Sequence, residues 1–438
     1  MSRSIASIVC NLAVAAGVSS ASAQTLTTLA TFNGTNGRDP RAGLTLSGNT
    51  LYGTTFTGGA SNLGTVFSVP VTGGTHTTLV TFNGTSGFQP VAGLILSGNT
   101  LYGTASQGGS GGRGTVFSVP VIGGTPTTLA TFNGANGALP IAGLILSAST
   151  LYGTTNIGGA NDLGTVFSVP VTGGPATTLV TFNGANGTQP VAGLILSGNT
   201  LYGTTRLGGT ATLGSVFSIP GAGEAITTLV TFNGANGSNP QAELTLSGNT
   251  LYGTTQSGGA NGCGTVFSVP VTGGTPTTLA TFNNTNGALP QAGLILSGST
   301  LYGTTVGGGA NNLGTVFSVS VTGGPVTTLV TFDGTNGTNP SAGLILSGNT
   351  LYGTTRRGGT SGFGTVFALV LPSPCGTPDF DGDGDEGTDA DIEAFFIVLA
   401  GGTCPTGTCG SIDFDGDGDA GTDADIEAFF RVIAGGPC

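Results

Sequence analysis

Apolar residues alternate with Thr and Ser along most of this 438-residue chain, in short runs separated by turn sequences. In the first unit, four such runs begin at Gly43 (GLTLSG), Thr50 (TLYGTT), Gly64 (GTVFSVPV) and Thr77 (TTLVTF). Alternation of this kind predicts short β-strands with one buried face. The intervening SGNT and TGG sequences suit tight hairpin turns. Each unit is therefore predicted to form a four-stranded antiparallel sheet, with strands called a, b, c and d in chain order.

This unit recurs with a fixed period of 50 residues. The motif LYGT begins at Leu51 and returns every 50 residues, for the seventh time at Leu351. Periods of this length are typical of solenoids, propellers and other repeat architectures. Seven units of four antiparallel strands predict an all-β, seven-bladed propeller over residues 24–371. A linear β-solenoid is the alternative.

The two ends of the repeat array favour a closed ring. The array begins with a lone d-type strand, TTLATF from Thr27, and its last unit, from Gly343 to Val370, has only a, b and c strands. The numbers of the four strand types match only if the N-terminal strand completes the last blade. Closure of this kind also removes exposed strand edges, whereas a solenoid gives no reason for the offset.

The repeated LYGTT, GG and GTVF sequences resemble the GloVer tandem repeat of exported bacterial proteins, from Thr27 to about Val370. The resemblance implies an extracellular setting and no particular activity.

The N-terminus agrees with export, because Arg3, an apolar stretch from Ile5 to Val18 and the sequence Ala21-Ser22-Ala23 predict a signal peptide over residues 1–23. A buried N-terminal strand or helix is the alternative. No later segment is apolar for long enough to cross a membrane, so we expect a secreted protein.

The b–c and d–a connections, residues 56–63 and 37–41 in the first unit, differ from unit to unit, whereas the a–b turn barely changes. Both variable connections are expected on the same face of a propeller, where a scaffold usually carries recognition. All six propeller arginines lie in them: Arg38, Arg41, Arg113, Arg206, Arg356 and Arg357. Ring closure would bring four of these together, Arg38 and Arg41 with Arg356 and Arg357. Such a group suits carboxylate, sulfate or phosphate, so an anionic glycan is the expected ligand. Ordinary solubilising charges, with Asp39 pairing one arginine, are the alternative.

The charge distribution and the sparse acid–base residues exclude other functions. The net charge is −12, there is no Lys, and 15 of the 20 acidic residues follow Cys375, so a nucleic-acid binder is not expected. A glycosidase needs two carboxylates beside the scissile bond, but the five propeller carboxylates, Glu243 among them, are scattered over different units. The only His, His76, is expected on the surface of a c–d turn, on the opposite face, and Cys263 as a free, partly buried thiol. We expect a non-enzyme; a polysaccharide lyase and a purely structural surface-coat protein are the alternatives.

Residues 379–396, DFDGDGDEGTDADIEAFF, repeat almost unchanged as residues 413–430. Asp379, Asp381, Asp383 and Asp385 match positions 1, 3, 5 and 7 of an EF-hand calcium loop, with Gly at position 6. The acidic residue expected at position 12 arrives one residue late, as Asp391, which we take as the closing ligand. A register that starts at Asp381 and closes with Glu393 loses the glycine. The second copy offers Asp413, Asp415, Asp417, Asp419 and Asp425, so two Ca²⁺ ions are expected.

A helix is expected after each loop. Thr388 and Asp391 have the spacing of a capping box, and the Phe pairs at 395–396 and 429–430 are expected to face each other in a small shared core. Cys375 and Cys404 are 29 residues apart, as are Cys409 and Cys438, which predicts these two disulfides. The rival pairing is Cys375–Cys438 with Cys404–Cys409.

Tandem calcium loops and helices that end in Gly-Gly-Pro-Cys resemble a GC-type dockerin, over residues 372–438. The resemblance implies attachment to a cohesin-like or other surface partner, with calcium held by the first three aspartates of each loop. A solvated acidic tail is the alternative.

Overall fold

The computed structural model describes residues 24, 26–221, 223, 225–371, 379–405, 409–414 and 421–434. The predicted signal peptide lies outside the described residues, as do Cys375, Cys438, Asp415, Asp417 and Asp419.

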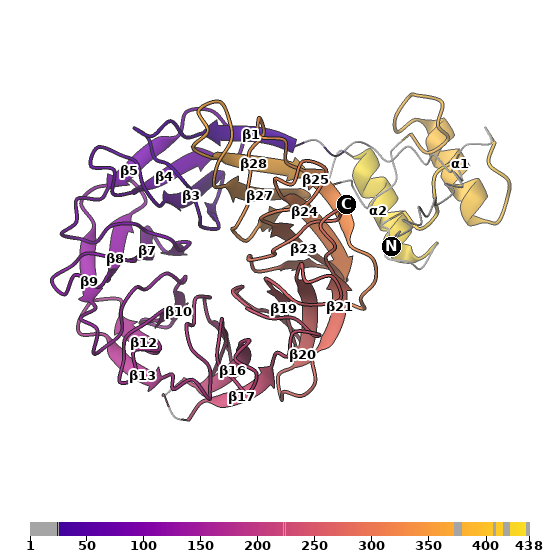
Figure 1. Cartoon of the computed structure of the whole chain (residues 1–438). Helices are drawn as coiled ribbons and strands as arrows, with labels where there is room; N and C mark the ends of the chain where they lie inside the picture. The colour runs from indigo at the N-terminus through magenta and orange to yellow at the C-terminus, as the bar shows by residue number, and fades with distance from the viewer. Residues whose placement is uncertain are drawn as a thin grey trace, which may run out of the picture.

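Seven antiparallel sheets of four strands each surround a central opening, which confirms the seven-bladed propeller (Figure 1). The first blade contains β2 (Thr45–Ser47), β3 (Thr50–Thr55), β4 (Thr65–Pro70) and β5 (Thr77–Thr81). The next three are β6 (Ile95–Ser97), β7 (Thr100–Ala105), β8 (Thr115–Pro120) and β9 (Thr127–Thr131); β10 (Ile145–Ser147), β11 (Thr150–Thr155), β12 (Thr165–Pro170) and β13 (Thr177–Thr181); and β14 (Ile195–Ser197), β15 (Thr200–Thr205), β16 (Ser215–Pro220) and β17 (Thr227–Thr231). The fifth and sixth are β18 (Thr245–Ser247), β19 (Thr250–Thr255), β20 (Thr265–Pro270) and β21 (Thr277–Thr281); and β22 (Ile295–Ser297), β23 (Thr300–Thr305), β24 (Thr315–Ser320) and β25 (Thr327–Thr331).

The seventh blade joins the two ends of the array. Its strand order is β1-β28-β27-β26, where β1 is Leu26–Thr31, β26 is Ile345–Ser347, β27 is Thr350–Thr355 and β28 is Thr365–Val370. β1 runs antiparallel to β28, with Leu26 opposite Leu369 and Thr31 opposite Thr365. The N-terminal strand therefore completes the last blade, as the strand counts predict.

Aromatic pairs pack neighbouring blades together. The Phe after each d strand contacts the Phe in the middle of the next blade's c strand, as Phe32 contacts Phe67 with ring centroids 5.0 Å apart. A Cβ on Gly53 would lie 2.5 Å from the Phe67 ring, which explains the glycine of the LYGT motif. The Tyr of this motif also packs between blades, because Tyr352 of the last blade lies in one cluster with Leu44 and Phe67 of the first. Packing between blades therefore explains why this tyrosine recurs once per blade.

The innermost strand of each blade is shorter than predicted. The run GLTLSG predicts a strand from Gly43, whereas β2 begins at Thr45 and has only three residues. Gly43 and Leu44 instead line the central opening, together with the equivalent residues of five other blades.

The described residues after the propeller contain two helices, α1 (Asp389–Leu399) and α2 (Asp423–Ile433). Each starts with the predicted capping box, at Thr388 and Thr422. Phe395 and Phe429 are fully buried and stack with ring centroids 4.0 Å apart, so the shared core is confirmed for them. Their neighbours Phe396 and Phe430 are 41% exposed, because adjacent helical residues point to different sides. The loop residues Phe380 and Phe414 fill the core instead.

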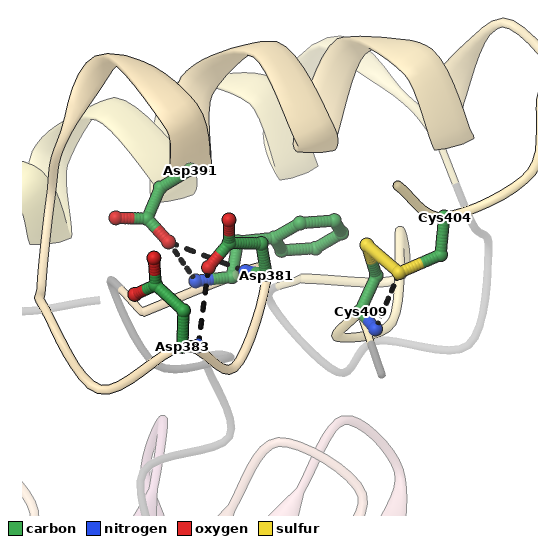
Figure 2. Close-up of a disulfide and its surroundings, with 6 residues drawn as sticks. Asp381, Asp383, Asp391, Cys404 and Cys409 are labelled. Atoms are coloured by element: carbon green, nitrogen blue, oxygen red, sulfur yellow. Dashed lines mark hydrogen bonds between the residues drawn. A yellow bond between two sulfur atoms is a disulfide. The ribbon is translucent and has the colours of Figure 1, made fainter. Parts of the chain in front are cut away.

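The observed disulfide joins Cys404 to Cys409, with their Cα atoms 5.6 Å apart (Figure 2). The predicted pairs Cys375–Cys404 and Cys409–Cys438 are therefore wrong. Their equal spacing reflects the duplication of the loop–helix unit, whereas the bond closes the short segment between its two copies. This bond is half of the rival pairing, and the other half lies outside the described residues.

Candidate functional site

The two variable connections of the propeller pair with each other in every unit. In the first, the Arg38 amide donates to the Thr57 carbonyl at 2.8 Å, and the Thr57 amide donates back at 3.1 Å. Equivalent bridges join residues 88 and 107, 138 and 157, 188 and 207, 238 and 257, 288 and 307, and 338 and 357. The prediction that both connections share one face is confirmed, and this surface is called the variable face below.

The backbone before each proline of the d–a connection is held in a left-handed conformation. Asp39 has a φ of 57°, and the residues at the other six equivalent positions have φ values of 53–59°. Non-glycine residues adopt this region at an energetic cost, so the surroundings must impose it. Here the Asp39 amide donates to Phe363 of the last blade, and the Asp39 carbonyl accepts from Phe56 of the first. These bonds fix Asp39 at the seam where the ring closes.

Asp39 joins two arginines at this seam. Its carboxylate accepts from Arg41 Nη2 at 2.6 Å and from Arg356 Nε at 3.0 Å. Burial alone would raise the pKa of Asp39, but the hydrogen bonds and charges of Arg41 and Arg356 outweigh it and hold the pKa below its ordinary value. The Arg41 guanidinium also lies over the Phe56 ring, 3.6 Å from its centroid. Both arginines are therefore held in fixed orientations.

The remaining two arginines of the seam are more accessible. Arg38 and Arg357 are exposed, and the Arg38 guanidinium lies 4.8 Å from the centroid of Phe363. Arg38, Arg41, Arg356, Arg357 and Asp39 are together called the arginine sector. Four guanidinium groups and one carboxylate give it a net charge of +3. Closure brings Arg41 and Arg356 together, because Asp39 pairs with both of them rather than with one, while Arg357 is the next residue after Arg356. Arg113 and Arg206 are exposed in other blades.

His76 is not a simple surface residue, so that expectation is wrong. Its imidazole is half-buried against Phe32 and Phe67, with ring centroids 5.4 and 5.9 Å away. Its Nε2 lies 3.1 Å from the carbonyl oxygen of Asn36. Burial lowers the pKa of His76, and the Asn36 carbonyl opposes this only in part. The c–d turn of the first blade leans onto β1, because the Gly74 amide donates to the Leu29 carbonyl.

Cys263 is a free, partly buried thiol, as predicted. It packs against the cluster that joins the fifth and sixth blades.

The first acidic loop brings three carboxylates together. Asp379, Asp381 and Asp383 each offer an oxygen atom, and these atoms lie within 4.8 Å of one another. The chain turns sharply at Gly384, whose φ is 100° and whose amide donates to Asp379 Oδ2 at 3.1 Å. A hydrogen bond shared with Asp383, loss of hydration and nearby negative charges raise the pKa of Asp385 to about 6. Convergent carboxylate oxygens of this kind are the ligands that Ca²⁺ prefers.

Asp391 accepts hydrogen bonds from its own loop–helix unit. Its carboxylate is fully buried, and Oδ1 accepts from the amides of Phe380 and Asp381 at 2.6 and 3.2 Å (Figure 2). Oδ2 accepts from the amide and hydroxyl of Thr388 at 2.8 and 3.0 Å. Four donors occupy the acceptor sites of a carboxylate. Asp391 therefore ties the start of the loop to the start of α1, and its role as a calcium ligand stays a prediction.

The second acidic loop repeats this arrangement where it is described. Asp425 is fully buried and accepts from the Phe414 amide at 2.7 Å and the Thr422 amide at 2.8 Å. Asp413 Oδ1 is buried and makes no hydrogen bond within the described part of the chain. A buried carboxylate oxygen that receives no hydrogen bond can instead coordinate a cation, so the residues present fit calcium.

The fold and its loop-bearing face define a repeat propeller as the class of protein. Over residues 18–217 and again over residues 147–367, the sequence matches the model of the Gloeobacter/Verrucomicrobia repeat, and the chain belongs to this family. The match confirms the repeat resemblance, whereas the dockerin resemblance stays a prediction. No curated protein matches the sequence.

Several solved structures are similar in fold. A putative 6-phosphogluconolactonase from Bacteroides uniformis is 18% identical, with a TM-score of 0.47, over 74% of this chain and 96% of that one. An oligogalacturonate lyase in complex with manganese is 13% identical, with a TM-score of 0.48, over 74% and 86% of the two chains. A chain of a nidogen/laminin complex is 16% identical, with a TM-score of 0.41, over 62% and 90%. These likenesses concern the fold alone.

Among the described residues, no helix is both long enough and apolar enough to cross a membrane.

Proposed function

We propose that this chain is an exported, non-catalytic binding propeller. Its variable face recognises an anionic polymer such as a uronate-bearing glycan. Its C-terminal loop–helix repeats bind two Ca²⁺ ions and, like a dockerin, attach the protein to a cohesin-like or other surface partner.

The arginine sector carries the first part of this proposal. Asp39 holds Arg41 and Arg356 in place but neutralises only one of the four positive charges. Guanidinium groups bind carboxylates and sulfates through paired hydrogen bonds, so an oriented pair beside two exposed arginines can contact successive groups of a polyanion. The contacts would be exposed, and each should contribute on the order of 1 kcal/mol or less.

Binding of the full-length protein to immobilised polygalacturonate tests the variable face. We expect retention that weakens with added salt, because exposed charges are screened. Arg38→Ala with Arg357→Ala should weaken binding about fivefold or more, since roughly 1 kcal/mol corresponds to fivefold. Arg113→Ala, which removes an exposed arginine elsewhere on the same face, is the matched control. Equal losses in both variants would contradict a sector-specific site.

The same incubation distinguishes binding from catalysis. A lyase would release unsaturated uronates, which are detected by their ultraviolet absorbance. Polymer cleavage that Arg356→Ala abolishes would replace the binding proposal with the lyase alternative. Absence of retention on any anionic glycan would favour a structural coat protein.

The aspartate group in the first loop supports the calcium proposal. A divalent cation among Asp379, Asp381 and Asp383 would neutralise carboxylates that otherwise repel one another at short range. The chain supplies the carboxylates and the glycine turn that holds them together.

Isothermal titration of the full-length protein with CaCl₂ should show two sites per chain. Asp381→Asn should remove one of them, because it deletes a negative ligand, while Asp389→Asn, at an exposed position in the first turn of α1, should leave both. The absence of binding at millimolar Ca²⁺ would remove the calcium proposal. Recovery of a surface partner that is lost when a chelator is added would support the attachment role.

A further inference from the structure

One position of the repeat is occupied by Gly in six units and by Glu in the fifth. The glycines are Gly43, Gly93, Gly143, Gly193, Gly293 and Gly343, and the exception is Glu243. This position lies two residues before the innermost strand, and six of the seven residues, all but Gly193, line the central opening of the propeller. The sequence alone suggests only a scattered carboxylate, because nothing in it shows that this position borders a cavity.

These positions form a ring around the axis, which is tight from Glu243 through Gly293, Gly343 and Gly43 to Gly93. A Cβ on Gly93 would lie 3.3 Å from the Gly43 carbonyl oxygen, and a Cβ on Gly43 would lie 3.3 Å from that of Gly343. Glu243 follows the same pattern, since its own carbonyl oxygen would lie 3.2 Å from a Cβ on Gly293. Its carboxylate leans over Gly193 of the preceding blade, with Oε2 3.0 Å from where that Cβ would stand. The glycine there leaves room for the carboxylate.

The ring borders a cavity of about 520 Å³ on the axis of the propeller. A volume of this size is ordinary for a small-molecule site. The wall consists of Gly, Leu, Ile and one Thr besides Glu243, which is the only ionisable residue among those that line it. Glu243 makes no hydrogen bond or ion pair with any described residue. Its side chain is exposed within the cavity, and partial desolvation of the carboxylate by the surrounding protein atoms raises the pKa of Glu243 to about 7.

We propose that this axial cavity binds a small organic ammonium ion, with the Glu243 carboxylate as its counter-ion and the Leu and Ile side chains contacting its aliphatic part.

The composition of the wall selects this class of ligand. A carboxylate that no described side chain pairs with attracts a cation, and it is the one charged group of an otherwise largely apolar wall. Ca²⁺ takes six to eight oxygen ligands, usually from several carboxylates, and this wall supplies one carboxylate. An alkylammonium ion carries a single charge on a group that donates three hydrogen bonds, and its hydrocarbon part suits Leu and Ile. The site is separate from the arginine sector and takes a ligand of the opposite charge.

Titration of the full-length protein with n-butylammonium chloride, followed by saturation-transfer NMR at fixed ionic strength, tests the proposal. At pH 8 we expect saturable binding at one site per chain, weakened at least tenfold in Glu243→Gln and Glu243→Gly. The second variant restores the residue of the other six units, so it is expected to fold. At pH 5 the wild-type affinity should also fall more than tenfold, because protonation of Glu243 competes with the ligand and no other lining residue titrates.

Asp162→Asn is the matched control. The Asp162 carboxylate accepts from the Gly158 amide at 2.9 Å, and Asn62 and Asn312 make the same bond in their own units. This variant removes a propeller carboxylate outside the cavity and should bind butylammonium like the wild type. Absence of saturable binding, equal binding by Glu243→Gln, or displacement of the probe by CaCl₂ but not by NaCl would each overturn the proposal.

A melting experiment shows whether a variant loses binding because it is misfolded or because it lacks the Glu243 carboxylate. A raised pKa favours the folded state below the pKa of the unfolded chain, and this stabilisation is lost as the pH rises through about 7. Glu243→Gly should therefore melt at a higher temperature than the wild type at pH 8 and show less of this gain at pH 5. A lower melting temperature at pH 8 would contradict an unpaired carboxylate in the cavity.

Discussion

A chain that begins at residue 33 is expected to lose the cooperative unfolding of the propeller. It lacks β1, which buries Leu29 and supplies the outer strand of the seventh blade, and it also lacks the fully buried Phe32. Truncating one buried Phe to Ala alone lowers the free energy of unfolding by about 3–5 kcal/mol. The deletion also leaves β28 as an unpaired edge, so self-association is expected.

Circular dichroism melting and light scattering measure the two effects. A chain that begins at residue 24, without the predicted signal peptide, is the control and should melt like the full-length protein. A synthetic peptide of residues 24–36 should restore the transition of the truncated chain, because β1 is the only strand of the described residues that it lacks. An unchanged melting temperature after removal of β1 would show that ring closure contributes little to stability.

Replacing Asp391 with Ala is expected to unfold the start of the first loop–helix unit. The substitution leaves the amides of Phe380 and Asp381 and both donors of Thr388 without their acceptor. A buried donor without a partner costs about 1–3 kcal/mol, so the loss should reach several kcal/mol. Hydrogen exchange at the Phe380 and Asp381 amides measures it directly. Asp389→Ala is the control.

The same contact makes this unit sensitive to acid. Burial alone would raise the pKa of Asp391, but hydrogen bonds from Thr388, Asp381 and Phe380 hold it below its ordinary value. A lowered pKa stabilises the fold above the pKa of the unfolded chain, near 4, and this contribution is lost as the pH falls through the folded pKa. Exchange at these amides should therefore accelerate below about pH 4. Identical protection in Asp391→Ala would refute the bracing role.

The propeller could be predicted because its causes are local and repeated. Alternation places Leu51, Val66 and Val80 on buried faces, and the turn sequences set the strand boundaries. The missing d strand of the last unit was enough to predict the pairing of β1 with β28. The sharing of one face by both variable connections also follows from antiparallel strand order.

The errors concern contacts that no periodicity encodes. His76 is half-buried because the turn that carries it leans onto β1, and Glu243 borders a cavity that exists only after the ring closes. The cysteine spacing was misleading because duplication alone produces equal intervals. Phe380 was overlooked because it lies between acidic residues, although its recurrence as Phe414 was a signal for a core position.

The pairing of β1 with β28 also constrains the order of events during synthesis. β1 leaves the ribosome long before its partner β28, which ends at residue 370, has been made. Until then the chain carries six blades that can form from neighbouring segments and a seventh that cannot. Contacts between such distant segments slow folding, and an open strand edge invites association with other chains. Folding of this propeller should therefore end, rather than begin, at its N-terminus.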